Sequence, residues 1–197
     1  MSLKRLAVFV SGSGTNLGAL IHSQKIGEMP GSIHLVISDQ PDCYGLVRAA
    51  KVGIPTKLIS LKADDPDPYP ELINLLYTES IDWIILAGFM RVLPASFVHS
   101  FRGRILNLHP ALLPKYGGVG MYGDHVHRAV LEAGDAISGA TVHLVDEGCD
   151  TGQILAQDRV NVYHGDDVDS LRARISPMER ALLVKTVNYY IEGAMNE

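Results

Sequence analysis

Short apolar runs alternate with segments of helical period along almost the whole sequence, and this alternation constrains the fold more than any other feature. Asp82–Ala87 is such a run, and its apolar character after the first residue is typical of a strand buried on both faces. Strands of that kind lie in parallel sheets whose faces are covered by the intervening helices. The alternation therefore predicts a single α/β domain with a mostly parallel, twisted sheet flanked by helices.

The runs also predict where each element lies. The expected strands are Leu6–Val10, Ile33–Ser38, Thr56–Ser60, Asp82–Ala87, Arg104–His109, Ala140–Asp146 and Ile154–Val162. The expected helices are Asn16–Gln24, Tyr44–Lys51, Pro70–Ser80, His125–Glu132 and a last segment that starts at Asp167. Pro177 removes a hydrogen bond from a regular helix, so we expect a break there, with Ser176 capping a second piece that ends at Gly193.

Composition narrows the classes of protein to consider. Hydrophobic residues make up 47% of the 197 residues, enough for a core, and we expect one domain over residues 1–197. Seventeen Lys and Arg against 22 Asp and Glu leave a net charge of −5, which argues against nucleic-acid binding through phosphate neutralisation. No apolar run is long enough for a membrane span or a signal core, so we expect a soluble, cytoplasmic protein. Cys43 and Cys149 lack zinc-ligand spacing and are expected to be free thiols.

A glycine-rich turn, Ser11–Leu17, joins the first expected strand to the first expected helix. Unpaired N–H groups at a helix start attract anions, and Gly12 and Gly14 allow an anion to approach closely. Leu17 stands where a dinucleotide fingerprint has its third glycine, and no Lys follows as in a nucleotide-triphosphate loop. We therefore expect the phosphate of a small substrate rather than NAD or ATP. The alternative is a tight turn with a polar helix cap and no ligand.

Asn107 and His109 lie on one face of the strand expected at 104–109, and Leu106 and Leu108 lie on the other. This strand ends just before a long loop rich in Pro and Gly, and the ligand crevice of an open α/β sheet lies at the carboxyl ends of its strands. The pair is therefore a candidate site, although either residue alone is usually a satisfied core residue.

The loop at 145–152 can supply a carboxylate from Asp146, Glu147 or Asp150, and residue chemistry alone does not choose among them. A carboxylate beside His109 would raise the pKa of the imidazole and orient the ring. The alternative is turn chemistry, in which Asp and Gly serve the backbone.

His125 and His127 raise the question of a metal site shared with His109. The first two are too close in sequence to share a helical face at i,i+4, and no Cys or acid has supporting spacing. We expect no metal.

Four segments in order carry a family resemblance: SGSGTNL at 11–17, AGFMRVL at 87–93, NLHPALLPKY at 107–116 and VDEGCDTGQILAQ at 145–157. Together they resemble the folate-dependent formyltransferases that act on glycinamide ribonucleotide in purine synthesis, and the resemblance covers nearly the whole chain. It implies a Rossmann-like formyltransferase fold and direct transfer of a formyl group from 10-formyltetrahydrofolate, the co-substrate, to the amine of glycinamide ribonucleotide. A tetrahedral carbon carrying an oxyanion would form on the way, without metal.

The resemblance also implies residue roles. The catalytic residues would be Asn107, His109 and Asp150. The residues for the substrate's phosphate and ribose would be Ser13, Gly14, Thr15, Asn16 and Glu179. The folate would contact Phe89, Met90, Arg91, Val92, Leu93 and Asn107. Two assignments have alternatives, because the strip at 89–93 also suits packing at a strand end and Ser176–Glu179 is a capping-box pattern.

The sequence departs from the family pattern in two places. Asp65 stands where many relatives carry an Arg that contacts the folate, which puts that contact in question. Gly117–Asp124 is longer and richer in glycine than its counterpart in the best-known members, and it flanks the expected site.

Other functions explain less of the pattern. A methionyl-tRNA formyltransferase would add a C-terminal domain and an RNA-binding surface, and a formyltetrahydrofolate hydrolase would add an N-terminal regulatory domain, so the length argues against both. An oxidoreductase or a noncatalytic nucleotide-binding module would leave Asn107, His109 and Asp150 unexplained. We therefore expect an enzyme with small-molecule partners and no nucleic-acid or membrane partner, working as a monomer or a homodimer.

Overall fold

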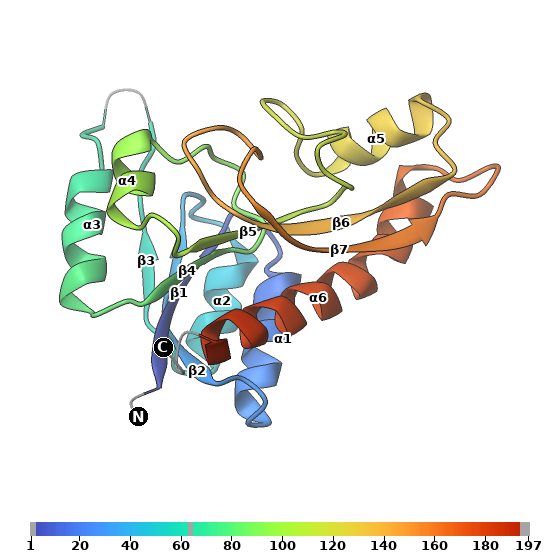
Figure 1. The fold of residues 1–197 in the computed structure, drawn as a ribbon. Coiled ribbons are helices and arrows are strands. Elements are labelled where there is room, and N and C mark those ends of the chain that lie inside the picture. The colour runs from blue at the N-terminus through green and yellow to red at the C-terminus, as the bar shows by residue number, and fades with distance from the viewer. Residues whose placement is uncertain (1–2, 63–64, 194–197) are drawn as a thin grey trace.

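The computed structural model describes residues 3–62 and 65–193. Its strands are β1 (Lys4–Val10), β2 (Gly31–Ser38), β3 (Thr56–Leu58), β4 (Trp83–Leu86), β5 (Ile105–His109), β6 (Ile137–Leu144) and β7 (Ile154–Asn161). They form one seven-stranded sheet in the order β3-β2-β1-β4-β5-β6-β7 (Figure 1). The strands from β3 to β5 pair in parallel, and β6 and β7 are added antiparallel beside β5. The predicted α/β domain with a mostly parallel sheet is confirmed.

The helices are α1 (Thr15–Lys25), α2 (Tyr44–Lys51), α3 (Tyr69–Thr78), α4 (Ala95–Ser100), α5 (Asp124–Glu132) and α6 (Val168–Gly193). Each expected strand occurs, with ends that differ by a few residues: β3 stops at Leu58 rather than Ser60, and β6 starts at Ile137 rather than Ala140. The expected helices also occur, and α4 is an additional one.

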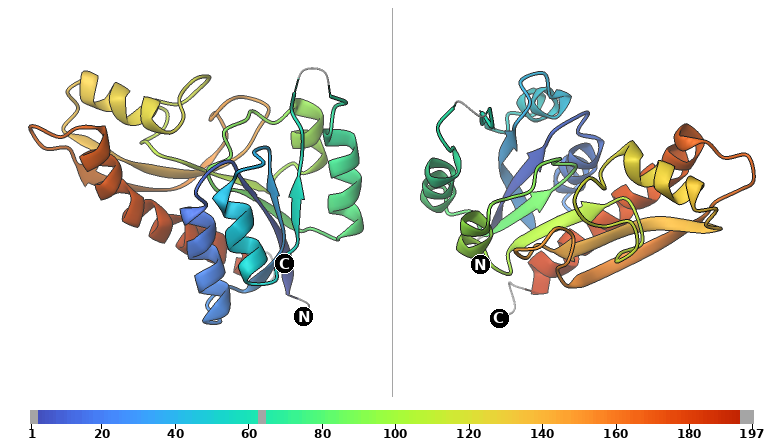
Figure 2. Two further views of the ribbon diagram at one scale, coloured as in Figure 1. Left: turned by 180° about the vertical axis from the view of Figure 1, so that it is seen from behind. Right: turned by 90° about the horizontal axis from the view of Figure 1, so that it is seen from above.

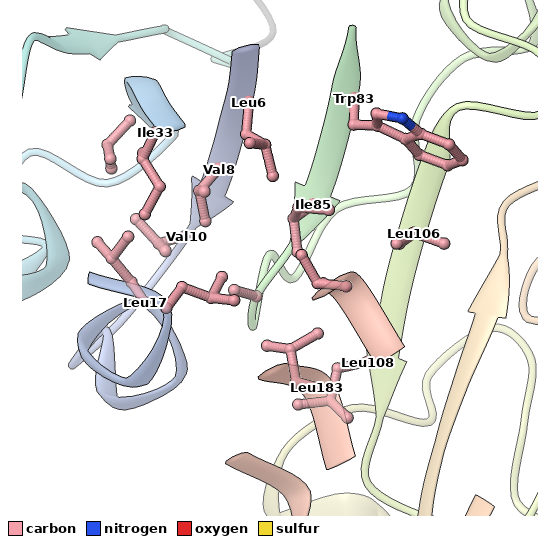
Figure 3. Close-up of a cluster of buried hydrophobic side chains, with 14 of the residues drawn as sticks. Leu6, Val8, Val10, Leu17, Ile33, Trp83, Ile85, Leu106, Leu108 and Leu183 are labelled. Carbon is pink, nitrogen blue, oxygen red and sulfur yellow. The ribbon is translucent and has the colours of Figure 1, made fainter. Parts of the chain in front are cut away.

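Helices cover both faces of the parallel part of the sheet (Figures 1 and 2). Alternate residues of β1 point to opposite faces, so Val8 packs on the side of α1, α2 and α6, while Phe9 packs on the side of α3 and α4. Figure 3 shows the first of these cores, where Leu17 of α1 and Leu183 of α6 lie under strand residues such as Ile85. Burial on two faces explains why β4 is apolar throughout.

α6 corrects one prediction, because it runs through Pro177 without the break that we expected at Ser176. Four side chains near the proline are buried, two before it and two after it: Leu171, Ile175, Leu182 and Leu183. A proline inside a helix costs about 3 kcal/mol, whereas burying each such side chain contributes roughly 1.5–3 kcal/mol. The carbonyl group left without a helical partner belongs to Ala173, which is an exposed residue. Packing therefore outweighs the local penalty.

α4 is not predicted by the sequence pattern, because six residues are too few to show a helical period. Tertiary contacts hold it instead. The ring of Phe97 lies edge-on to Phe9 and Tyr69, with centroid distances of 5.9 and 5.5 Å.

The strand order reverses between β1 and β4, since β1 lies between β2 and β4. Crossovers leave toward opposite faces at such a point, which opens a crevice at the carboxyl ends of the strands. The turn after β1, the segment after β4 and the end of β5 meet at this edge. In the described ranges 3–62 and 65–193, no helix has the length and apolar character to cross a membrane.

Candidate active site

A cavity of about 1000 Å³ lies at this edge of the sheet. Its lining brings together residues from every group predicted as a site: Ser13, Thr15, Asn16, Phe89, Met90, Arg91, Val92, Leu93, Asn107, His109, Asp150 and Glu179. Gly14 does not line the cavity, and it is the residue that precedes α1 in the turn. The volume is at the upper end of the range for small-molecule sites, which leaves room for two ligands side by side.

The glycine turn presents the start of α1 to the cavity. Gly14 precedes the helix with a φ of +65°, and a Cβ there would lie 2.6 Å from the Cα of Gly45, so no other residue fits without strain. No side chain caps the helix, which makes the polar-cap alternative wrong. The first helical amides, those of Thr15 and Asn16, therefore have no capping side chain to accept from them.

Asn107, His109 and Asp150 lie together, as predicted. Asn107 and His109 project from the same face of β5, and Asp150 reaches them from the loop between β6 and β7. One carboxylate oxygen, Oδ2, lies 3.5 Å from His109 Nδ1, and the other, Oδ1, accepts a 3.4 Å hydrogen bond from Asn107 Nδ2. The structure thus selects Asp150 from the acids of this loop. Glu147 instead pairs with Arg102 at 2.9 Å on the surface.

Asp150 is held in place by its backbone and by its neighbours. Its φ is +58°, and its Oδ2 accepts a 3.1 Å hydrogen bond from the Gly118 amide. Burial acts to raise the pKa of the carboxyl group, but His143, the charge of His109 and the Gly118 amide together hold that pKa below its usual value. Asp150 is therefore an anion at neutral pH.

Asp150 acts to raise the pKa of His109, as predicted, but burial opposes it and dominates. Burial lowers the pKa of this imidazole below 6.5, while the charge of Asp150 and the carbonyl of Tyr116 oppose the shift without overcoming it. Nε2 donates a 2.8 Å hydrogen bond to the Tyr116 carbonyl, which identifies the nitrogen that carries the proton. The sequence indicates the carboxylate partner but not how deeply the ring is buried, and burial decides the direction of the pKa shift.

His143 of β6 belongs to the site and was missed by the sequence reasoning. It lies opposite Asn107 in the antiparallel pair of β5 and β6. Its Nδ1 lies 2.7 Å from the Leu144 carbonyl oxygen, and its Nε2 lies 3.0 Å from Asn107 Nδ2. The same Nε2 lies 3.6 Å from Asp150 Oδ1. The available signal was a histidine between two apolar residues, Val142 and Leu144.

Glu179 faces the glycine turn from α6. Its carboxylate accepts a 3.4 Å hydrogen bond from Asn16 Nδ2, and burial raises its pKa while Asn16 and the charge of Arg180 oppose the shift. Asn16 Oδ1 is buried and has no hydrogen-bond partner within the described chain. Because no helix starts at Ser176, the capping-box alternative for Glu179 no longer applies. Arg180 lines the cavity beside it and was not predicted.

The strip Phe89–Leu93 forms another wall of the cavity. Phe89 and Leu93 are buried in the core, as the packing alternative predicted, whereas Met90 and Val92 are 49% and 63% exposed. The strip is thus anchored at its ends and open in the middle.

The two departures from the family pattern have different positions. Asp65 accepts a hydrogen bond from the Ser60 hydroxyl and does not line the cavity. The loop at 117–124 lines it from Gly118 to Asp124 and supplies the amide that binds Asp150.

Cys43 and Cys149 are free thiols, as expected. Residues 3–62 and 65–193 hold no group of three or more His, Cys, Asp or Glu side chains arranged to bind a metal ion. His127 lines the cavity, and its Nδ1 has no partner within the described chain.

Fold and site together define a class of protein. An α/β domain that combines an uncapped helix start with an Asn, His and Asp cluster in one cavity has the geometry of a small-molecule enzyme site. The chain matches the formyl transferase family over residues 4–187 and belongs to that family.

Relatives within the family share most of the chain. It is 40% identical over 192 residues to the chloroplastic phosphoribosylglycinamide formyltransferase of Arabidopsis thaliana, which covers 96% of this chain and 66% of the relative. It is 38% identical over 192 residues to the phosphoribosylglycinamide formyltransferase of Escherichia coli K12, which covers 96% and 88%. The crystal structure of phosphoribosylglycinamide formyltransferase from Bacillus halodurans superposes with a TM-score of 0.89 at 35% identity, covering 97% of both chains. The chain spans 14% of the trifunctional purine biosynthetic protein of Drosophila melanogaster, to which it is 45% identical over 196 residues.

Proposed function

We propose that this protein transfers the formyl group of 10-formyltetrahydrofolate to the amine of glycinamide ribonucleotide, a step of purine biosynthesis. The cluster of Asn107, His109 and Asp150, in the same cavity as the anion-binding turn, carries the proposal. Relatives named for this activity match 96% of the chain, which supports it. We expect the enzyme to work in the cytoplasm.

The chemistry assigns roles to the three residues. The substrate amine bonds to the formyl carbon while the carbonyl electrons move to oxygen, and they return as the carbon–nitrogen bond to the folate breaks. The amine loses one proton and the folate nitrogen gains one. Asn107 Nδ2 and His109 are the donors to the oxyanion. The 3.4 Å bond from Asn107 to Asp150 is long, so its N–H is the one available for this purpose.

His109 gains a proton as the reaction proceeds: the water that takes the proton from the amine passes it to the imidazole, and the folate nitrogen receives it as the tetrahedral carbon collapses. In the free protein the ring is largely neutral at pH 7, because burial lowers its pKa. A negative charge forming beside it favours the protonated ring, and the ionised Asp150 at 3.5 Å stabilises that form. Asp150 also holds the water that takes the proton from the amine.

The substrate binds at the N-terminal turn. Its phosphate contacts the turn formed by Ser13, Gly14, Thr15 and Asn16, and its ribose hydroxyls donate to Glu179. The bare start of α1 and the hydrogen bond between Asn16 and Glu179 support this arrangement.

The folate occupies the remaining wall. Its pterin ring lies along Phe89, Met90, Arg91, Val92 and Leu93, with Asn107 at the reacting end. The exposed middle of the strip supports this placement. We propose no metal in the reaction, since the three residues supply the donors and the charge that the oxyanion needs.

A formyl-transfer assay tests the function. The purified protein is mixed with 10-formyltetrahydrofolate and glycinamide ribonucleotide, and tetrahydrofolate formation is followed by absorbance. We expect turnover that depends on glycinamide ribonucleotide. Turnover with water alone would identify a hydrolase, and turnover with a different amine alone would identify another formyltransferase.

A further inference from the structure

A second, smaller cavity of about 440 Å³ adjoins the first and shares Met90, Arg91 and Tyr122 with it. Asp39 lies in its wall, directly after β2, with a side chain that is 1% exposed. Neither the catalytic cluster nor the substrate turn includes this buried acid, which therefore needs an explanation of its own.

Three donors converge on the Asp39 carboxylate. Ser11 Oγ donates at 2.6 Å, Gln40 Nε2 at 2.7 Å and Arg91 Nε at 2.9 Å. Burial acts to raise the pKa of Asp39, and the three donors hold it below its usual value. The group is thus an anion, and its neighbours must present protons to it.

The charge of Asp39 fixes the direction of the Ser11 hydroxyl. This hydroxyl has a single proton, which the carboxylate accepts, so its oxygen faces the Met90 amide and accepts a hydrogen bond from it at 3.0 Å. The Ser11 amide in turn donates to the Gly88 carbonyl at 3.0 Å. A chain of hydrogen bonds thus runs from Asp39 through Ser11 to the backbone after β4.

The segment Gly88–Leu93 has few other polar anchors. Within the described part of the chain, each hydrogen bond that ties it to another element ends on Ser11 or Asp39. Gly88 starts the segment with a φ of +83°, a backbone conformation that glycine adopts readily. Asp39, Ser11 and Arg91 follow β2, β1 and β4, which are neighbours in the sheet (Figure 1).

We propose that Asp39 is a positioning residue for the folate: through Ser11 and Arg91 it holds Gly88–Leu93 in the shape that the pterin ring requires. This inference rests on the proposed function, which puts the folate along that strip. Asp39 acts on the substrate turn less directly, because its hydrogen bonds reach Ser11 but none of the residues from Ser13 to Asn16.

Two variants test the inference. Asp39→Asn keeps the size of the side chain and removes its charge, and Ser11→Ala removes the link to the Met90 amide. In both we expect the KM for 10-formyltetrahydrofolate to rise about 10-fold, the size of effect expected for one hydrogen bond to a charged group. The KM for glycinamide ribonucleotide and kcat should stay within about 2-fold. Asp42→Asn is the matched control, because Asp42 is an exposed acid in the wall of the same small cavity.

The outcomes separate positioning from a merely structural role. A lower Tm with both KM values unchanged, or with both raised equally, would overturn the inference. Calorimetry with tetrahydrofolate gives a readout that does not depend on turnover, and we expect weaker binding to Asp39→Asn than to the unaltered protein. Unaltered protein that neither binds tetrahydrofolate nor formylates glycinamide ribonucleotide would instead overturn the proposed function.

Discussion

Replacing Asp150 with Asn separates the charge of this residue from its shape. The backbone at Asp150 has a φ of +58°, a conformation that Asn adopts as readily as Asp, and the amide oxygen can still accept from Gly118 at 3.1 Å. We therefore expect Asp150→Asn to fold normally. Alanine would add backbone strain at this position and confuse the result.

The size of the effect follows from the distance to His109. Two unit charges 3.5 Å apart attract each other by about 5 kcal/mol at an effective dielectric constant of ~20. Since each 1.4 kcal/mol or so is a factor of ten, losing this attraction lowers the availability of protonated His109 by up to ~10³. The loss of an oxyanion donor typically lowers kcat by ~10²–10³, so we expect Asp150→Asn to fall in that range.

The assay is the initial rate of tetrahydrofolate formation at saturating substrates, at pH 7.5. Glu147→Gln is the matched control, because it removes a charge from the same loop at a surface pair with Arg102. We expect this control to stay within about 2-fold of the unaltered protein, as is usual for exposed ion pairs. Equal rates for the two variants, or a near-normal rate for Asp150→Asn, would refute the reasoning.

The remaining predictions concern the turn and two histidines. Gly14→Ala places a methyl group 2.6 Å from the Cα of Gly45 at a φ of +65°. We therefore expect the free energy of unfolding, measured with denaturant, to fall by about 1–3 kcal/mol, and the KM for glycinamide ribonucleotide to rise. An unchanged stability and an unchanged KM would refute the proposed role of the glycine turn. His109→Asn should lower kcat by ~10²–10³ with little change in either KM, and a normal kcat would remove His109 from the chemistry. Burial lowers the pKa of His127 below 6.5, so below that pH the unfolded chain binds more protons, and stability rises with pH up to about 6.5 and levels off above it. His127→Asn should flatten this rise in unfolding curves measured between pH 5 and 7.5, and an unchanged slope would show that His127 does not contribute.

The strands of the parallel sheet could be predicted from the sequence because burial on both faces leaves a local signal. Asp82–Ala87 is apolar after its first residue, and the strand observed there, β4, is buried throughout. The position of Asn107 and His109 on one face followed from the two-residue period alone. Predictions of this kind succeed because they depend on near neighbours in the chain.

The register of the strands and the burial of each residue depend on the whole fold, and they account for what could not be predicted from the sequence. His143 joins the site because β6 runs antiparallel beside β5 and puts it opposite Asn107, which no local pattern specifies. The helix break at Pro177 was wrong because side chains on both sides of the proline pack against distant elements. The carboxylate neighbour of His109 acts to raise its pKa as predicted, but the net shift is downward because burial dominates, and burial is not a local property of the sequence.

β5 is an interior strand, paired with β4 on one edge and β6 on the other. Amides between two such neighbours exchange with deuterium only through large openings of the sheet, so those at 106–108 should be among the slowest in the molecule. The loop at 117–124, whose Val119 is 88% exposed, should exchange many orders of magnitude faster. Hydrogen exchange would then distinguish a slowly opening strand, which carries Asn107, from a loop at the cavity edge that opens much faster. Movement of the loop would therefore be possible without opening of the strand.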